Sequence, residues 1–220
     1  MIEKLDSLPA LIKELSPLTV TSRTGRPAGI TEIHDPGEHV GDWQAALAYL
    51  KAGNKRYLEN RTMKHNANEK DRAVLKNGQK PFTVIVTCSD SRLSPEIYFD
   101  QKLGDLFVIR NAGNIVDATT LGSIEYAVEH LKVPLVVVVG HNSCGAVTSA
   151  FAGGKYSKNL QTIIDAINPA IENCDCLDNA ISKNTDYTVE RIKKNEIVRH
   201  MRATVIGAHY NIETGVVSFG

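Results

Sequence analysis

The chain has 220 residues, which is enough to bury a hydrophobic core without disulfides and suits one domain with an appendage. Its 25 basic and 25 acidic side chains balance, which gives no electrostatic reason to expect nucleic acid or a membrane surface as a partner. The longest apolar stretch, Val133 to Val139, is too short to span a bilayer and contains Pro134. The first residues mix acids and bases and lack the pattern of a signal peptide, so we expect a cytoplasmic protein.

The N-terminal part of the chain is predicted to be helical with one irregular interruption. Apolar residues recur at helical spacing over residues 2–15, which predicts a short amphipathic helix. Residues 16–41 contain three prolines and four glycines without a sustained period, so we expect an irregular loop there. Asp42 is a suitable N-cap for a helix from Trp43 to about Arg61.

A different pattern begins near residue 82, where apolar runs without alternation predict strands covered on both faces. These predicted strands span residues 82–87, 106–109 and 135–139. Apolar stripes at helical spacing predict helices at 121–131, 144–151, 160–173 and 187–202. Two last apolar runs within residues 203–219, separated by Thr214 and Gly215, predict a C-terminal antiparallel hairpin.

Strands that alternate with helices indicate an α/β fold with a mainly parallel central sheet flanked by helices. We expect residues 1–60 to form an N-terminal helical arm and residues 61–220 to form the α/β domain, with the hairpin at the sheet edge. In such sheets, functional sites form beyond the carboxyl ends of the strands. Two segments rich in polar and ligating residues follow predicted strands at that position.

The first of these segments is CSDSR, residues 88–92. In an extended chain, residues two apart face the same side, so Cys88 and Asp90 can address one point in space. Arg92 can lie beside Asp90 in the same way.

The second segment is HNSC, residues 141–144, in which a gap of two residues lets a tight turn bring His141 and Cys144 onto one metal ion. Together with Cys88 these residues offer two thiolates and an imidazole, a ligand set that favours zinc. Asp90 could supply an oxygen as a fourth ligand.

Other interpretations of the cysteines are open at this point. Each ligand candidate, taken singly, is as consistent with a structural role as with metal binding. A closed structural zinc site would need a fourth Cys or His, but Cys174 and Cys176 are expected to be exposed, free thiols. A thiol redox protein would be expected to carry a CxxC pair, which Cys88 and Cys144 do not form. Three ligands with one exchangeable position are typical of a catalytic zinc site.

Over roughly residues 43–220 the sequence resembles the β-class carbonic anhydrases. CSDSR and HNSCGA have the form and order of the family's motifs, and segments 46–60, 103–114 and 121–131 also resemble the family. The resemblance implies a parallel-cored α/β sheet and an N-terminal arm, here residues 1–60, that packs on a partner subunit. It also implies a homodimer or homotetramer.

The resemblance assigns roles to individual residues of this sequence. It makes Cys88, His141 and Cys144 the zinc ligands and makes Asp90 and Arg92 an acidic–basic pair at the catalytic centre. The substrate-binding positions that it implies are Gln79, Phe107, Tyr126 and Gly145. In plant-like members of the family, the glutamine that matches Gln79 is contributed across the dimer interface. His34 and His39 match nothing in the family, and we expect them to be solvated.

The reaction implied by the resemblance is the reversible hydration of carbon dioxide to bicarbonate and a proton by zinc-bound hydroxide. Asp90, kept ionised by Arg92, would orient the hydroxide, or would close the site by binding zinc itself if Arg92 released it. Carbonyl sulfide and carbon disulfide are alternative substrates, because access to the pocket would decide between them and carbon dioxide. A non-catalytic zinc-stabilised binding module would have no need of Asp90, Arg92 and Gln79.

The sequence departs from some bacterial members of the family at one position. Those members carry a Trp three residues before the first zinc Cys, as part of an inhibitory bicarbonate site. This chain has Ile85 there, which puts that form of control in doubt although Arg110 is present.

Overall fold

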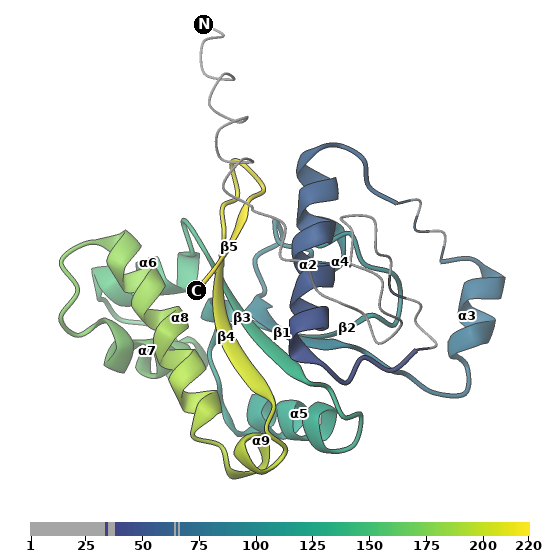
Figure 1. The fold of residues 1–220 in the computed structure, drawn as a ribbon. Coiled ribbons are helices and arrows are strands. Elements are labelled where there is room, and N and C mark those ends of the chain that lie inside the picture. Colours follow the sequence, from purple (N-terminus) through teal and green to yellow (C-terminus); the bar gives the residue numbers. More distant parts are fainter. Residues whose placement is uncertain (1–33, 35–37, 64, 66) are drawn as a thin grey trace, which may run out of the picture.

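The computed structural model describes residues 34, 38–63, 65 and 67–220 (Figure 1). The predicted helix at 2–15 and most of the predicted loop at 16–41 lie outside these residues. Five strands of the described part form one sheet in the order β2-β1-β3-β4-β5. Their bounds are β1 Thr83–Cys88, β2 Leu106–Asn111, β3 Leu135–His141, β4 Thr204–Tyr210 and β5 Val217–Phe219.

The sheet confirms the predicted α/β fold. Strands β1 to β4 are mutually parallel, and β5 pairs with β4 in the antiparallel hairpin that was expected at the C-terminus. Every residue of β1 and β3 is buried, because helices pack on both faces of the sheet (Figure 1). Ile85 packs in the same core as α2, α6 and α7, whereas its neighbour Val84 packs with α5 and α9.

The helices agree with most of the predicted ones. Their bounds are α2 Trp43–Leu58, α3 Glu69–Leu75, α4 Pro95–Tyr98, α5 Ala118–Glu129, α6 Gly145–Ala152, α7 Lys158–Ile171, α8 Leu177–Lys193 and α9 Glu196–His200. A short 3-10 helix, η1, spans Ala112–Asn114. None of the helices in the described residues is both long and apolar enough to cross a membrane.

One predicted helix is wrong in its bounds, and two short helices were not predicted. The segment predicted as a helix at 187–202 is split between α8, which begins ten residues earlier, and α9. The first turns of α8 are mostly polar, so a periodic apolar signal is weak there, although Ala180 and Ile181 are buried. Helices α3 and α4 are too short for such a signal to be read.

Helix α2 begins as expected, because the side chain of Asp42 accepts a hydrogen bond from the backbone N–H of Gln44. The helix packs on this chain's own core through Ala46 and Leu50. The side chain of Asn54 binds three backbone groups: its Nδ2 donates to the carbonyls of Tyr98 and Gly215 at 2.9 Å each, and its Oδ1 accepts from Val217 N at 3.0 Å. Asn54 therefore fastens the C-terminal hairpin to α2.

The expectation that His34 is solvated is wrong, since only 2% of its surface is exposed. Its Nδ1 lies 2.7 Å from Oδ1 of Asp105, and its ring packs edge-on against Phe82 and Tyr49. The neighbouring aromatic rings and the buried carboxylate of Asp105 shield the His34 imidazole from solvent. His39 is exposed, as expected.

Candidate metal centre

Two cysteines and one histidine come together where β1 and β3 end. The Cys88 Sγ, the Cys144 Sγ and a ring nitrogen of His141 all lie within 4.8 Å of one another, and all three residues are buried. Cys88 is the last residue of β1 and His141 is the last residue of β3, which runs beside it. Ser143 adopts a left-handed conformation, with φ of 56°, which turns the chain so that Cys144, at the N-cap position of α6, lies next to His141.

This donor set fits a zinc ion. The two sulfur atoms are 4.0 Å apart, and both cysteines are free thiols. Two sulfurs that each lie about 2.3 Å from a tetrahedral zinc would be separated by about 3.8 Å. The observed separation is therefore close to that of two ligands on one metal ion.

The orientation of His141 also fits metal binding. Its Nδ1 lies 2.9 Å from the backbone carbonyl of Asn142, so Nδ1 carries the proton and donates. Its Nε2 is buried without a hydrogen-bond partner among the described residues. The side chain of Asn142 accepts a hydrogen bond from Ile212 N at 2.8 Å, which holds this turn against the β4–β5 connection. A buried lone pair with no protein partner suits a ligand atom for a metal.

The two thiols share one hydrogen bond, and their acidities are coupled. The hydrogen bond from Cys144 lowers the pKa of Cys88 to about 4, and the backbone N–H of Gly113, 3.3 Å from the Cys88 sulfur, also stabilises the thiolate. The hydrogen bond to Cys88 and burial raise the pKa of Cys144 well above its usual value. One proton therefore stays between the sulfurs, and a divalent cation at this point would replace it.

Asp90 and Arg92 form the ion pair expected from the sequence. The Arg92 Nε donates to Asp90 Oδ1 at 2.9 Å and its Nη2 donates to Oδ2 at 2.7 Å. The backbone N–H of Arg92 donates to Oδ1 as well, at 3.0 Å. These hydrogen bonds hold the pKa of Asp90 well below its usual range, so the carboxylate stays ionised. Arg92 also reaches the carbonyl of Ser143 at 3.4 Å, which connects the two motifs.

Arg110 takes part in the site, a role that no local feature of the sequence predicts. Its Nε donates to the carbonyl of Cys88 at 3.2 Å and its Nη2 donates to the carbonyl of Asp90 at 2.7 Å. Arg110 lies on β2, in register with Thr87 of β1. The strand register, which would have revealed this proximity, cannot be read from one sequence.

Close packing behind His141 depends on Gly140. A β-carbon at Gly140 would lie 2.2 Å from Oγ1 of Thr185 on α8, so only glycine fits between β3 and this helix. Gly145, by contrast, has open space where a β-carbon would be, since no atom of the described residues lies within 4 Å of that point.

The remaining predicted site residues are not close to the cysteines within one chain. Gln79 is exposed in the loop that precedes β1, so the length of that strand, about 16 Å, separates it from Cys88. Phe107 lies in register with Val84, near the beginning of β1 rather than its end. Its ring is 6.3 Å from that of Tyr126, which is 47% exposed on α5.

The chain matches known proteins over this fold and site. The family model for carbonic anhydrase matches residues 83–217. Carbonic anhydrase 2 of Mycobacterium tuberculosis is 52% identical over 113 residues, which are 51% of this chain and 53% of that protein. A carbonic anhydrase of Mycolicibacterium smegmatis is 43% identical over 136 residues, which are 60% of this chain and 64% of that protein. The matched segments thus span between about half and two thirds of these relatives.

Solved structures of the same class share the fold. A tetrameric β-carbonic anhydrase from Sordaria macrospora has a TM-score of 0.64 at 27% identity, covering 80% of this chain and 95% of that one. The Coccomyxa β-carbonic anhydrase in complex with acetazolamide has a TM-score of 0.63 at 26% identity, covering 80% and 81%. With the family model matching more than half of its residues, this chain belongs to the β-class carbonic anhydrase family.

Proposed function

We propose that this chain hydrates carbon dioxide reversibly to bicarbonate and a proton, at a zinc ion held by Cys88, His141 and Cys144. The observation that carries the proposal is the buried cluster of these three side chains with an ionised carboxylate, that of Asp90, two residues after Cys88. A purely structural zinc site would not need the carboxylate or its arginine partner.

The ligand roles follow from the atoms available. Cys88 and Cys144 would bind through their sulfurs, and His141 would bind through Nε2, because its Nδ1 already donates to the Asn142 carbonyl. When bound, zinc supplies the acidity that makes hydroxide available from water near neutral pH.

Asp90 has one atom suited to orienting the attacking water. Its Oδ1 accepts hydrogen bonds from both N and Nε of Arg92, whereas Oδ2 accepts only from Nη2. A carboxylate oxygen can accept two hydrogen bonds, so Oδ2 has a lone pair left. We assign Oδ2 to accept a hydrogen bond from the nucleophile. This hydrogen bond would orient the nucleophile so that the lone pair on its own oxygen points at the carbon of carbon dioxide. The pairing with Arg92 supports a state in which Asp90 stays away from the metal.

The substrate pocket in this proposal is completed by a second copy of the chain. Gln79, Phe107 and Tyr126 are implied by the family as substrate-binding residues, yet each lies away from the cysteine cluster of its own chain. Phe107 and Tyr126 would supply apolar walls for an uncharged substrate. The N-terminal arm is assigned to the same contact with the partner subunit. The tetrameric relative from Sordaria macrospora supports an assembly of this kind.

Stopped-flow measurement of carbon dioxide hydration, together with metal analysis of the purified protein, tests the proposal. We expect about one zinc per chain and turnover that disappears when a chelator removes the metal. A parallel assay with carbon disulfide distinguishes the alternative substrate class. Zinc-loaded protein that hydrates no carbon dioxide would overturn the proposal.

A further inference from the structure

The turn after β2 donates a hydrogen bond to one of the candidate metal ligands. This turn is η1, and the N–H of its middle residue, Gly113, lies 3.3 Å from the Cys88 sulfur. Gly113 has φ of 76°, a left-handed conformation that glycine adopts without strain. A β-carbon there would also lie 2.9 Å from Ile167 and 3.2 Å from Ala146, so the turn is packed tightly against α6 and α7.

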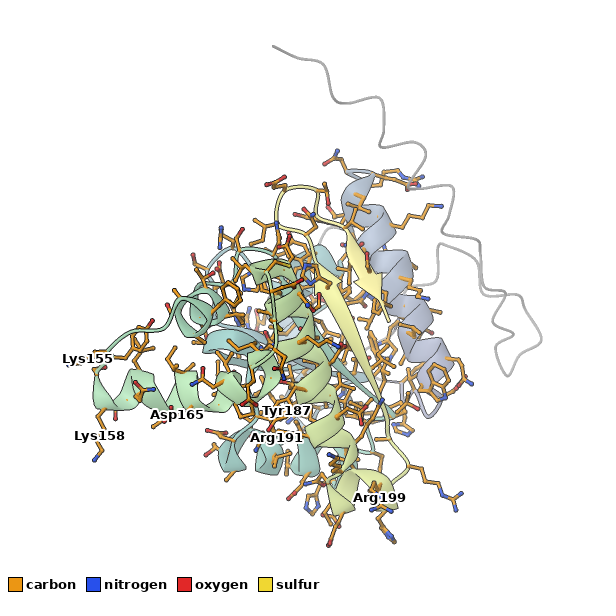
Figure 2. All side chains as sticks on the ribbon, turned by 90° about the vertical axis from the view of Figure 1, so that its left-hand side faces the viewer. Lys155, Lys158, Asp165, Tyr187, Arg191 and Arg199 are labelled. Atoms are coloured by element: carbon orange, nitrogen blue, oxygen red, sulfur yellow. The ribbon has the colours of Figure 1, made fainter. Side chains whose placement is uncertain are left out.

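Helix α8 holds this turn by two buried side chains one helical turn apart. The Asn184 Nδ2 donates to the carbonyl of Gly113 at 2.8 Å, and the Thr188 Oγ1 donates to the carbonyl of Asn114 at 3.2 Å. Both side chains are buried, with Asn184 only 1% exposed. The same helix carries Tyr187 and Arg191, and the Arg191 guanidinium lies 6.0 Å from the centre of the Tyr187 ring. Both residues are labelled in Figure 2, which shows the course of α8.

The two hydrogen bonds from α8 differ in what they reach. Asn184 holds the residue whose own N–H donates to the Cys88 sulfur, whereas Thr188 holds the residue after it, for which no bond to the sulfur is found. The amide of Asn184 is also only half paired, because its Oδ1 has no partner among the described residues. An unpaired buried oxygen costs stability, so this amide is a poor choice for filling space alone. What the amide does supply is its Nδ2 donor.

We infer that Asn184 is a positioning residue for the metal centre: it holds the carbonyl of Gly113 and, through the left-handed backbone of that residue, keeps the Gly113 N–H directed at the Cys88 thiolate. This inference rests on the proposed zinc site. An N–H that donates to a thiolate disperses its charge and fixes the direction of its lone pairs toward the metal. Without Asn184, the turn would lose the anchor that acts on Gly113 itself and keep only that of Thr188 on Asn114, so the Cys88 sulfur would hold the metal less firmly.

The test compares Asn184→Ala and Asn184→Leu with Thr188→Val, each in the full chain loaded with zinc. Leucine keeps the shape of asparagine, so Asn184→Leu gives a folded variant if the alanine variant is too unstable. Thr188→Val is the matched control, because it removes a buried hydrogen bond to the same turn. The measurements are the rate of zinc release to a chromogenic chelator and, after cobalt substitution, the sulfur-to-metal charge-transfer absorption.

We expect both Asn184 variants to release zinc about tenfold faster than the unmodified chain, as is typical when a residue behind a ligand is removed. We also expect their cobalt charge-transfer bands to shift, with Thr188→Val close to the unmodified chain in both measurements. Release rates that are equal for Asn184→Leu and Thr188→Val would overturn the inference, since the effect would then be general loosening of the turn. An unmodified chain that binds no zinc would overturn the proposed function instead.

Discussion

The guanidinium of Arg92 binds the carboxylate of Asp90 through two hydrogen bonds: Nε donates to Oδ1 at 2.9 Å, and Nη2 donates to Oδ2 at 2.7 Å. The Arg92 side chain is 50% exposed, whereas that of Asp90 is 16% exposed. Because this ion pair is partly exposed, water screens the attraction between its charges, and ion pairs of this kind contribute little to folding stability. The fork does fix the direction of the carboxylate, because a planar guanidinium permits one orientation of its partner. We therefore expect this pair to matter for catalysis more than for stability.

Replacing Arg92 with alanine tests this separation. We expect kcat/KM for carbon dioxide hydration in Arg92→Ala to fall by about 10- to 100-fold, because Asp90 is no longer held in one orientation. Zinc content should stay near one per chain, since Arg92 touches none of the three ligand atoms. Stopped-flow kinetics and metal analysis on the same preparation measure both quantities.

Two further variants serve as controls for Arg92→Ala. Arg92→Lys keeps the charge but not the two-point grip, and we expect it to recover only part of the activity. Arg199→Ala removes an exposed arginine on α9, which is labelled in Figure 2. Because α9 precedes the amino end of β4, Arg199 lies at the opposite end of the sheet from the cluster. The activity of Arg199→Ala should equal that of the unmodified protein. Undiminished turnover in Arg92→Ala would refute the orienting role.

The pH dependence of activity should come from a group other than Asp90. The hydrogen bonds from Arg92 lower the pKa of Asp90. The carboxylate therefore stays ionised from alkaline pH down to pH values below the ordinary pKa of an aspartate, about 3.9. Two thiolate ligands offset the charge of zinc, and we therefore expect activity to rise toward alkaline pH. NMR of carbon-13-labelled aspartate, with Asp90→Asn to assign the signal, should show no titration of Asp90 between about pH 5 and 9. A midpoint inside that interval, or activity that is flat across it, would contradict this prediction.

Much of the sheet and the metal cluster follows from local features of the sequence. The runs that end at Cys88 and His141 are continuous and apolar, so they predict buried parallel strands. Strands of that kind bring polar residues at their carboxyl ends to one edge of the sheet. Asp42 also predicts the beginning of α2 correctly, since an N-cap interaction involves only residues close in sequence.

The contacts that hold the cluster from behind could not be predicted in the same way. Arg110 reaches the CSDSR segment because β2 pairs with β1 in one particular register, which a single sequence does not determine. Asn184 lies in the part of α8 whose polar sequence carries only a weak apolar stripe, and it contacts a residue 71 positions away. Such long-range polar contacts depend on how the elements pack, so they become visible only in the folded chain.

The fit between Gly140 and α8 gives a prediction about stability. In Gly140→Ala the new β-carbon would lie 2.2 Å from Oγ1 of Thr185, so α8 or the end of β3 must move. Overpacking of this kind costs about 1–3 kcal/mol in the free energy of unfolding. Urea denaturation in the presence of a chelator measures this cost without the contribution of metal binding.

A double variant distinguishes this clash from a general intolerance of change at Gly140. Thr185→Ala removes the hydroxyl and leaves Cβ of residue 185 at 3.4 Å, an ordinary contact distance. We expect Gly140→Ala with Thr185→Ala to be more stable than Gly140→Ala alone. If Thr185→Ala instead lowers the free energy of unfolding of the Gly140→Ala variant further, residues 140 and 185 do not clash as described.

The position of Gln79 gives a prediction about subunit cooperation. Gln79 lies before the amino end of β1, and Cys88 is the last residue of that strand. The family resemblance implies that this glutamine acts across the dimer interface, so we expect Gln79 of one chain to serve the metal centre of its partner. We expect Gln79→Ala and Asp90→Asn to be nearly inactive when each is purified alone. Co-refolding equal amounts of the two variants should restore activity to about a quarter of the unmodified level, because half of the dimers are mixed and each has one intact site. If Gln79 acts within its own chain, every site in a mixed dimer carries one defect, and no activity returns.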